Sequence, residues 1–166
     1  MARKAATKRT SKWLTREQQM TWRSFGFMFQ TLHSALESQM KQDSDLSFIE
    51  YYALARLSEE TDHRLRMSEL ARECNASLSR LSHLIKRLES RGMVRREPDA
   101  TDGRFTVAIL TNAGYKKLLA SAPAHVDCVR QLVIGDFTAA EQAQLREMSN
   151  RIVARIEASG WKHNLI

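Results

Sequence analysis

Apolar residues recur at steps of three and four along much of the chain, which is the spacing of one face of an α-helix. The longest run covers residues 15–42, with apolar positions at Trp22, Phe25, Phe29, Leu32, Leu36 and Met40. Similar runs fill residues 111–159, where Pro123 is expected to kink or split the first helix. Long amphipathic helices are therefore predicted on both sides of a central segment.

Short polar residues mark where these helices begin. Three helix starts carry a capping box, in which Ser or Thr is followed three residues later by Glu or Gln. The pairs are Thr15 with Gln18, Ser47 with Glu50, and Thr138 with Glu141. These positions predict the first residues of the first, second and last helices.

The central segment, residues 47–110, has shorter elements. A helix after Ser47 is followed by a strand fragment at 65–67, a brief helix after Ser68, and another that Ser77 caps and Gly92 ends. The buried side of this last helix is predicted to be Leu78, Leu81, Leu84, Ile85 and Leu88. Residues 93–96 and 105–110 then change to the pattern of extended chain around the turn-forming EPDATDGR, which predicts a β-hairpin.

Two short helices joined by a tight turn and followed by a hairpin outline a winged helix-turn-helix. The predicted fold is mainly α (α+β), with this module over about 47–110 and long helices over about 15–42 and 111–159. Residues 14–166 are expected to form one domain. Residues 1–13 are rich in cations and lack acids, and they are expected to form a basic disordered arm.

Charge suggests the kind of partner. Lys and Arg number 26 against 19 Asp and Glu, a formal charge of +7, which favours a polyanion such as nucleic acid or an acidic membrane surface. No apolar run approaches the roughly 18 residues of a membrane span, and the first residues do not form a secretory signal. We therefore expect a cytoplasmic protein that does not enter a membrane.

Catalytic and metal-binding signals are missing from the sequence. Cys74 and Cys128 are too few and too far apart for a disulfide framework or a zinc site, and the five histidines have no ligand spacing. There is no Gly-rich phosphate loop, His-Glu-x-x-His or Gly-x-Ser-x-Gly. We expect no metal, no cofactor and no enzymatic activity, and two reduced thiols.

The helix after Ser77 carries the candidate chemistry. With its leucines turned inward, helical spacing turns polar and basic residues outward, where small side chains let a helix backbone approach base edges and phosphates. The candidate DNA-binding residues of this helix are Ser77, Ser79, Arg80, Ser82, His83 and Arg87. Arg80 can contact a guanine edge and Arg87 a phosphate, although an ordinary solvated basic face has the same pattern.

The hairpin turn adds a second candidate contact. Gly103 allows a tight bend, and Asp102 can orient the Arg104 guanidinium by paired hydrogen bonds. An arginine on a projecting turn suits the negative potential of a narrow minor groove. The same pair could also be a plain turn salt bridge.

From Trp13 onward the chain resembles the MarR-type (multiple antibiotic resistance regulator) transcription factors. The stretch MSELARECNASLSRLSHLIKRLESRGMVRREP resembles the family's helix-turn-helix, and DGRFTVAILTNAG fits its Asp-x-Arg wing followed by Leu-Thr-x-x-Gly. The resemblance implies that Asp102 and Arg104 act in the wing. It also implies a homodimer of the first and last helices that represses genes until a small aromatic or phenolic ligand weakens its hold on DNA.

The residues support a homodimer independently, because the apolar faces of the terminal helices exceed what a small DNA-binding core needs. A two-fold dimer predicts a pseudopalindromic site on double-stranded DNA. An aromatic effector should bind between the dimer helices and the winged module, and the candidate pocket residues are His33, Tyr51, Tyr52 and Arg56. These four residues could equally just pack the joint.

Two alternatives remain open at this stage. One is a nonspecific architectural DNA binder, and the other is a redox-responsive regulator that would use Cys74 or Cys128. The effector, the operator and the direction of regulation do not follow from the sequence, nor does a DNA contact by the basic arm.

Overall fold

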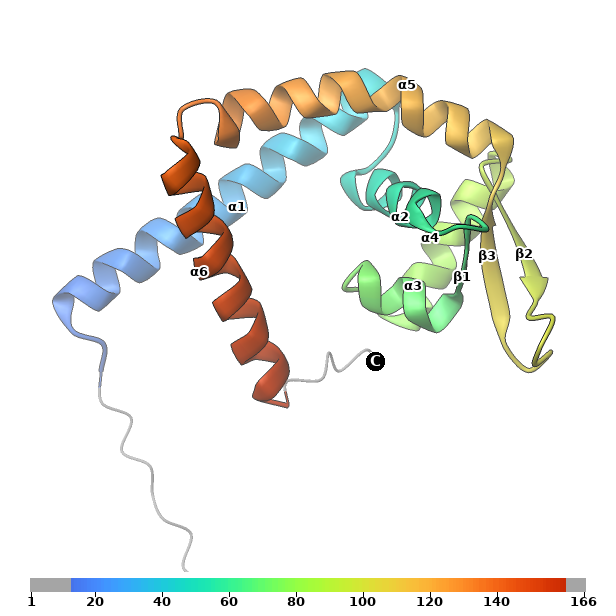
Figure 1. The fold of residues 1–166 in the computed structure, drawn as a ribbon, viewed down its shortest axis with the longest axis horizontal. Coiled ribbons are helices and arrows are strands. Elements are labelled where there is room, and N and C mark those ends of the chain that lie inside the picture. Colours follow the sequence, from blue (N-terminus) through green and yellow to red (C-terminus); the bar gives the residue numbers. More distant parts are fainter. Residues whose placement is uncertain (1–12, 161–166) are drawn as a thin grey trace, which may run out of the picture. The chain divides into compact units, whose positions relative to one another are not determined.

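The computed structural model describes residues 13–160, which divide into two compact units between Ser34 and Ala35 (Figure 1). Except for its last residue, the basic arm expected over residues 1–13 lies outside the described residues. Within the described range, no helix is both long and apolar enough to span a bilayer.

Helix α1 (Arg16–Ser44) starts at the capping box predicted from Thr15 and Gln18. The Thr15 amide donates to Gln18 Oε1 at 3.0 Å, and the Gln18 amide donates to Thr15 Oγ1 at 3.3 Å. The helix ends two residues later than expected, where Asp45 takes a positive φ of 49°. Its first 19 residues, as far as Ser34, belong to the N-terminal unit.

The second unit contains the predicted winged helix-turn-helix (Figure 1). Its elements are α2 (Phe48–Glu59), β1 (Arg64–Arg66), α3 (Met67–Glu73), α4 (Leu78–Ser90), β2 (Val94–Pro98) and β3 (Thr106–Leu110). The sheet is antiparallel in the order β1-β3-β2, so β3 pairs with both neighbours. A mainly helical fold with a β-hairpin wing is confirmed.

Local hydrogen bonds explain where these elements begin and end. Ser47 and Glu50 form the predicted capping box of α2, and the Ser77 hydroxyl accepts from the Arg80 amide at the start of α4. Gly92 follows α4 with a φ of +69°, a conformation that favours glycine and that turns the chain into β2.

The core lies where α2, α3 and α4 meet the sheet and the end of α1. Its fully buried side chains include Met40, Leu46, Leu54, Leu57, Leu70, Leu81, Ile85, Leu88 and Val94. Four of the five residues predicted for the buried side of α4 are buried, but Leu78 is 51% exposed and that prediction is wrong. Leu78 is the first residue of the helix, one turn before the part that packs on the core.

Helix α5 (Asn112–Val129) is joined tightly to the hairpin. The Thr111 hydroxyl accepts from the Gly114 amide at 3.1 Å and donates to the Gly92 carbonyl at 2.7 Å. A Cβ built on Gly114 would lie 2.8 Å from Leu110 Cδ1 and 2.9 Å from the Met93 carbonyl carbon. Glycine at position 114 is therefore what lets α5 start against the strands.

The C-terminal helices follow this joint. Helix α5 runs through Pro123 without a break, so the expected split there does not occur. The regular α-helical hydrogen bonding ends instead at a π-helical turn, Arg130–Ile134. Helix α6 (Ala139–Ala158) begins at the predicted capping box of Thr138 and Glu141.

Candidate nucleic-acid interface

The outward face of α4 is polar and basic, as the sequence predicts. Ser79, Arg80, His83 and Lys86 are exposed, on the side away from the buried leucines. Ser82 is half-buried on the flank that faces the hairpin. This face therefore offers short hydroxyl groups, an imidazole and two cations to an approaching ligand.

Ser77 does not belong to that face. Its side chain is 2% exposed, and its Oγ accepts the Arg80 amide at 2.9 Å. The hydroxyl caps the helix and is turned away from the exposed face, and a DNA contact by Ser77 stays a prediction.

Arg87 is exposed but already has a partner inside the protein. Its Nε donates to Oε1 of the buried Glu50 at 3.1 Å, which ties α4 to the start of α2. Burial alone would raise the Glu50 pKa. Hydrogen bonds from the Ser47 amide and from Arg87 together outweigh burial, so the pKa lies below its ordinary 4.5. The charged carboxylate holds one side of the guanidinium, and the exposed remainder can still approach a phosphate.

The wing turn places an arginine at its tip. The Arg104 side chain is 85% exposed, and its Nε and Nη2 donate to Asp102 Oδ1 and Oδ2 at 2.9 and 2.6 Å. The paired hydrogen bonds predicted between these residues are thus present. They lower the pKa of Asp102, which keeps its carboxylate charged and the guanidinium oriented.

Asp99 holds the rest of the wing loop, a role that the sequence reasoning missed. Its Oδ1 accepts from the Thr101 amide at 2.8 Å, the Thr101 hydroxyl at 2.6 Å and the Asp102 amide at 3.3 Å. Its Oδ2 accepts from Arg66 Nε at 2.6 Å. The Thr101 hydroxyl and Arg66 together hold the Asp99 pKa well below its ordinary value.

Arg66 reaches this loop from β1. Its guanidinium also lies 4.8 Å from the centroid of the Phe105 ring, in cation–π geometry. The Asp-Ala-Thr-Asp run at 99–102 could have signalled the local turn, but nothing in the sequence joins it to an arginine 33 residues earlier. The wing is therefore attached to the first strand as well as to its own hairpin.

A further ion pair fixes α4 against the hairpin. Arg96 in β2 donates from Nε and Nη2 to Glu89 Oε2 at 3.0 and 2.6 Å. These bonds lower the Glu89 pKa, so the pair stays charged. This ion pair therefore links α4 to the second strand of the hairpin.

The four candidate pocket residues have different surroundings. His33 is exposed on α1 in the other compact unit. Tyr51 is half-buried, Tyr52 is exposed, and Arg56 forms ion pairs with Glu59 and with Glu73 at 3.2 Å. Arg56 thus already has carboxylate partners within the chain.

The Tyr51 ring contacts the imidazole of His125, which lies on α5. The two ring centroids are 4.6 Å apart, the Phe48 ring is 5.9 Å away, and His125 Nδ1 lies 3.3 Å from Gln39 Oε1. Burial lowers the His125 pKa below its ordinary 6.5. Sequence reasoning missed this cluster because His125 is 74 residues from Tyr51 and has no motif around it.

The surroundings of the cysteine thiols and acidic side chains were the remaining candidates for metal or thiol chemistry. Among residues 13–160, no three His, Cys, Asp or Glu side chains are arranged to hold a metal ion. Burial raises the pKa of the Cys74 thiol to about 11, so it stays protonated and unreactive at neutral pH. Cys128 is a half-buried free cysteine.

Comparison with known proteins gives a consistent picture. A family model described as the MarR family matches residues 44–104. The chain is similar to Sco3205 of Streptomyces coelicolor, a MarR family transcriptional regulator solved in complex with DNA, with 43% identity and a TM-score of 0.83 over 86% of this chain and 89% of that one. AbsC, a MarR family transcriptional regulator from the same organism, is 34% identical with a TM-score of 0.84, over 89% of this chain and 99% of that one.

A curated relative matches over a shorter stretch. The transcriptional repressor MprA of Escherichia coli is 25% identical over 107 residues, which is 64% of this chain and 60% of its own length. The chain therefore matches somewhat less than two thirds of that relative.

Proposed function

The chain belongs to the MarR family of transcriptional regulators, and from that premise we propose that it binds a specific DNA sequence with α4 in the major groove and the wing at the minor groove beside it. One observation carries the proposal: the polar, basic face of α4 and the arginine-tipped turn belong to the same module, with α4 joined to β2 by the Arg96–Glu89 ion pair and the Arg104 guanidinium oriented by Asp102. The solved DNA complex of Sco3205, at 43% identity, supports it.

Each group has a proposed part in this contact. Ser79 and Ser82 are short enough to let the α4 backbone approach the bases, and Arg80 and His83 can reach base edges. Arg104 enters the minor groove with Asp102 orienting it, and Arg87 contacts a phosphate while Glu50 holds its Nε. Ser77 caps the helix that carries these groups.

Selection of bound duplexes from a random DNA pool tests the proposal. The affinity for the selected duplex should exceed that for random sequence by about a thousandfold or more at one fixed salt concentration. A ratio near one would favour the architectural alternative. With about 6 to 10 phosphate contacts, a plot of log affinity against log salt concentration should have a slope near −0.9 per contact. An affinity that does not change with salt would contradict both the sequence-specific regulator and the architectural DNA binder.

We further propose that the protein acts as a homodimer. Each of the helices α1, α5 and α6 exposes large apolar side chains, and such faces favour a partner surface. Examples are Trp22, Phe29, Val126, Val153 and Ile156. A two-fold dimer presents two copies of α4, so the selected DNA should have a dyad with half-sites about 10 base pairs apart.

The mass in solution tests the dimer directly. Phe29→Glu should shift the sedimentation coefficient towards that of the monomer, because it puts a charge on the apolar face of α1. Gln30→Glu makes a similar charge change at an exposed position beside that face and should leave the dimer intact. If Phe29→Glu sediments as the wild type does, α1 does not form the interface.

We also propose that a small aromatic acid or phenol weakens DNA binding from the joint between α2 and α5. The rings of Phe48, Tyr51 and His125 gather there beside Gln39, which offers stacking surfaces and polar partners. Arg56 is not part of this proposal because Glu59 and Glu73 already pair with it. The ligand would act by favouring one spacing of the two reading helices over another.

Salicylate titrated against the protein–DNA complex, with fluorescence anisotropy as the readout, tests this site. Release should need more salicylate for Tyr51→Ala, with DNA affinity in its absence unchanged, while Tyr52→Ala should behave as the wild type. A panel of aromatic acids that releases no DNA would contradict effector control.

The direction of regulation is proposed by analogy with MprA, which is named a repressor. Repression predicts that transcription in vitro from a promoter overlapping the selected site falls as protein is added. We propose that the protein works beside the DNA, in the cytoplasm. A redox-responsive regulator is the weaker alternative because the Cys74 thiol is buried and protonated; DNA affinity that changes after mild peroxide would revive it.

A further inference from the structure

An apolar side chain stands at the N-terminal end of α4. Leu78 is the first residue of this helix and is 51% exposed, while its neighbours Ser79 and Arg80 are polar. The residues that α4 contributes to the core are leucines and an isoleucine further along the helix, and Leu78 is not among them. A single exposed leucine is common on protein surfaces, so the significance of Leu78 depends on the groups around it.

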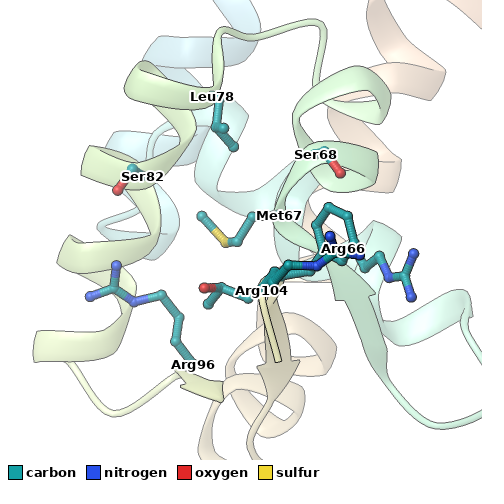
Figure 2. A pocket seen from close by; sticks show the side chains of 9 residues that line it. Arg66, Met67, Ser68, Leu78, Ser82, Arg96 and Arg104 are labelled. Atoms are coloured by element: carbon teal, nitrogen blue, oxygen red, sulfur yellow. The ribbon is translucent and has the colours of Figure 1, made fainter. Parts of the chain in front are cut away.

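Leu78 lines a pocket between α3, α4 and the wing (Figure 2). The pocket has a volume of about 290 Å³, and Met67 and Phe105 supply the other large apolar groups in its wall. In Figure 2, the Leu78 side chain extends from the start of α4 into the pocket, toward Met67. Ser68 and Ser82 lie at its sides, on α3 and α4 respectively.

The charges around the pocket are already paired. Its three arginines are Arg66, Arg96 and Arg104, and their guanidinium groups bind the carboxylates of Asp99, Glu89 and Asp102 at 2.6 Å. A free phosphate or carboxylate would have to compete with these acids. An uncharged apolar group meets no such competition and gains contact with Leu78, Met67 and Phe105.

Double-stranded DNA offers one such group in the major groove, the C5-methyl of thymine. We propose that Leu78 contacts this methyl group, with Met67 and Phe105 behind it, and so makes the protein require thymine at one position of each half-site. The inference rests on the proposed function, because it needs α4 to lie in the major groove.

Replacing thymine by deoxyuridine removes the methyl group and leaves every hydrogen-bonding group of the base in place. The loss of one apolar methyl contact corresponds to about a fourfold change in affinity, and two half-sites to about fifteenfold. The probe is the duplex selected from the random pool, prepared once with thymine and once with deoxyuridine throughout. Wild-type protein should bind the thymine duplex about fifteenfold more tightly.

Leu78→Ala should abolish this ratio, because its affinity for the two duplexes should be nearly the same. Alanine retains the helix at an exposed first position, and circular dichroism checks the fold. Lys86→Ala is the matched control: it shortens another exposed side chain of the same face, so it should weaken both duplexes and keep the fifteenfold ratio. Deoxyuridine placed at single sites should lower affinity at one position in each half-site.

Two results would overturn the inference. The wild type could bind both duplexes equally, or Leu78→Ala could keep the full thymine preference, which would assign the pocket to a different partner such as a protein segment. In each case the preference of the wild type for selected over random DNA still reports separately on the proposed function.

Discussion

Gly114→Ala tests how closely α5 is joined to the hairpin. At an open helical position this change stabilises a protein by about 0.5–1 kcal/mol, because alanine is the better helix former. At position 114 the added Cβ would lie 2.9 Å from the Met93 carbonyl carbon, and still closer to its oxygen. A normal carbon–carbon contact is about 3.5–4.0 Å, so the backbone would have to move by at least about 0.6 Å.

That movement is opposed by the hydrogen bonds of the joint. The Met93 carbonyl accepts the Thr111 amide at 3.1 Å, and the Thr111 hydroxyl bonds both Gly92 and Gly114. Forcing extra atoms into a packed site typically destabilises by about 1–3 kcal/mol. We therefore expect a net loss of about 2 kcal/mol in the free energy of unfolding, measured by urea denaturation at one protein concentration.

Gly26→Ala in α1 is the matched control. A Cβ at position 26 would meet nothing within 4 Å, so this variant should be as stable as the wild type or slightly more so. Repeating the measurement over a range of protein concentrations separates any effect on association. If Gly114→Ala is as stable as Gly26→Ala, the close approach of α5 to Met93 is not a real constraint.

Three further predictions follow from the packing and the charges. Leu88→Ala should lower the free energy of unfolding by about 2–5 kcal/mol, because it leaves a cavity in the core. Arg104→Ala should weaken DNA binding but keep the free energy of unfolding within about 0.5 kcal/mol of the wild type. Equal losses of stability in the two variants would contradict a buried Leu88 and an exposed Arg104. Glu50→Gln should lower the free energy of unfolding by about 1–3 kcal/mol at pH 7, because it weakens the interaction with Arg87. Because the Glu50 pKa is lowered in the folded protein, this difference from the wild type should disappear as the pH falls through that lowered value, below 4.5. Burial lowers the His125 pKa, so protonation of His125 favours the unfolded chain. The urea concentration at the midpoint of wild-type unfolding should therefore decrease as the pH is lowered below 6.5. For His125→Gln this midpoint should depend less on pH between pH 7.5 and 5.5.

Features that depend on residues three or four apart were predictable from the sequence. The capping boxes of Ser47 with Glu50 and of Thr138 with Glu141 are present where the spacing places them. The winged module and the pairing of Asp102 with Arg104 are likewise local patterns, each set by a turn or a helical repeat. Short spacing constrains geometry enough for chemistry to be inferred.

Contacts between distant segments were not predictable in this way. Arg66 binds Asp99 across 33 residues and Arg87 binds Glu50 across 37, and a single sequence does not show which arginine meets which acid. Leu78 was misassigned for a different reason. Helical periodicity gives the side of the helix on which a residue lies, but it does not show where the helix leaves the core.

The Asp99 carboxylate holds the wing loop in place before any DNA is present. A loop that is disordered until it binds must give up its conformational freedom during association, and each side chain immobilised at that moment costs about 0.5–1.5 kcal/mol. Here the backbone around Thr101 and Asp102 is ordered when the chain folds. In the proposed DNA complex, this part of the loop would therefore need little further ordering during association.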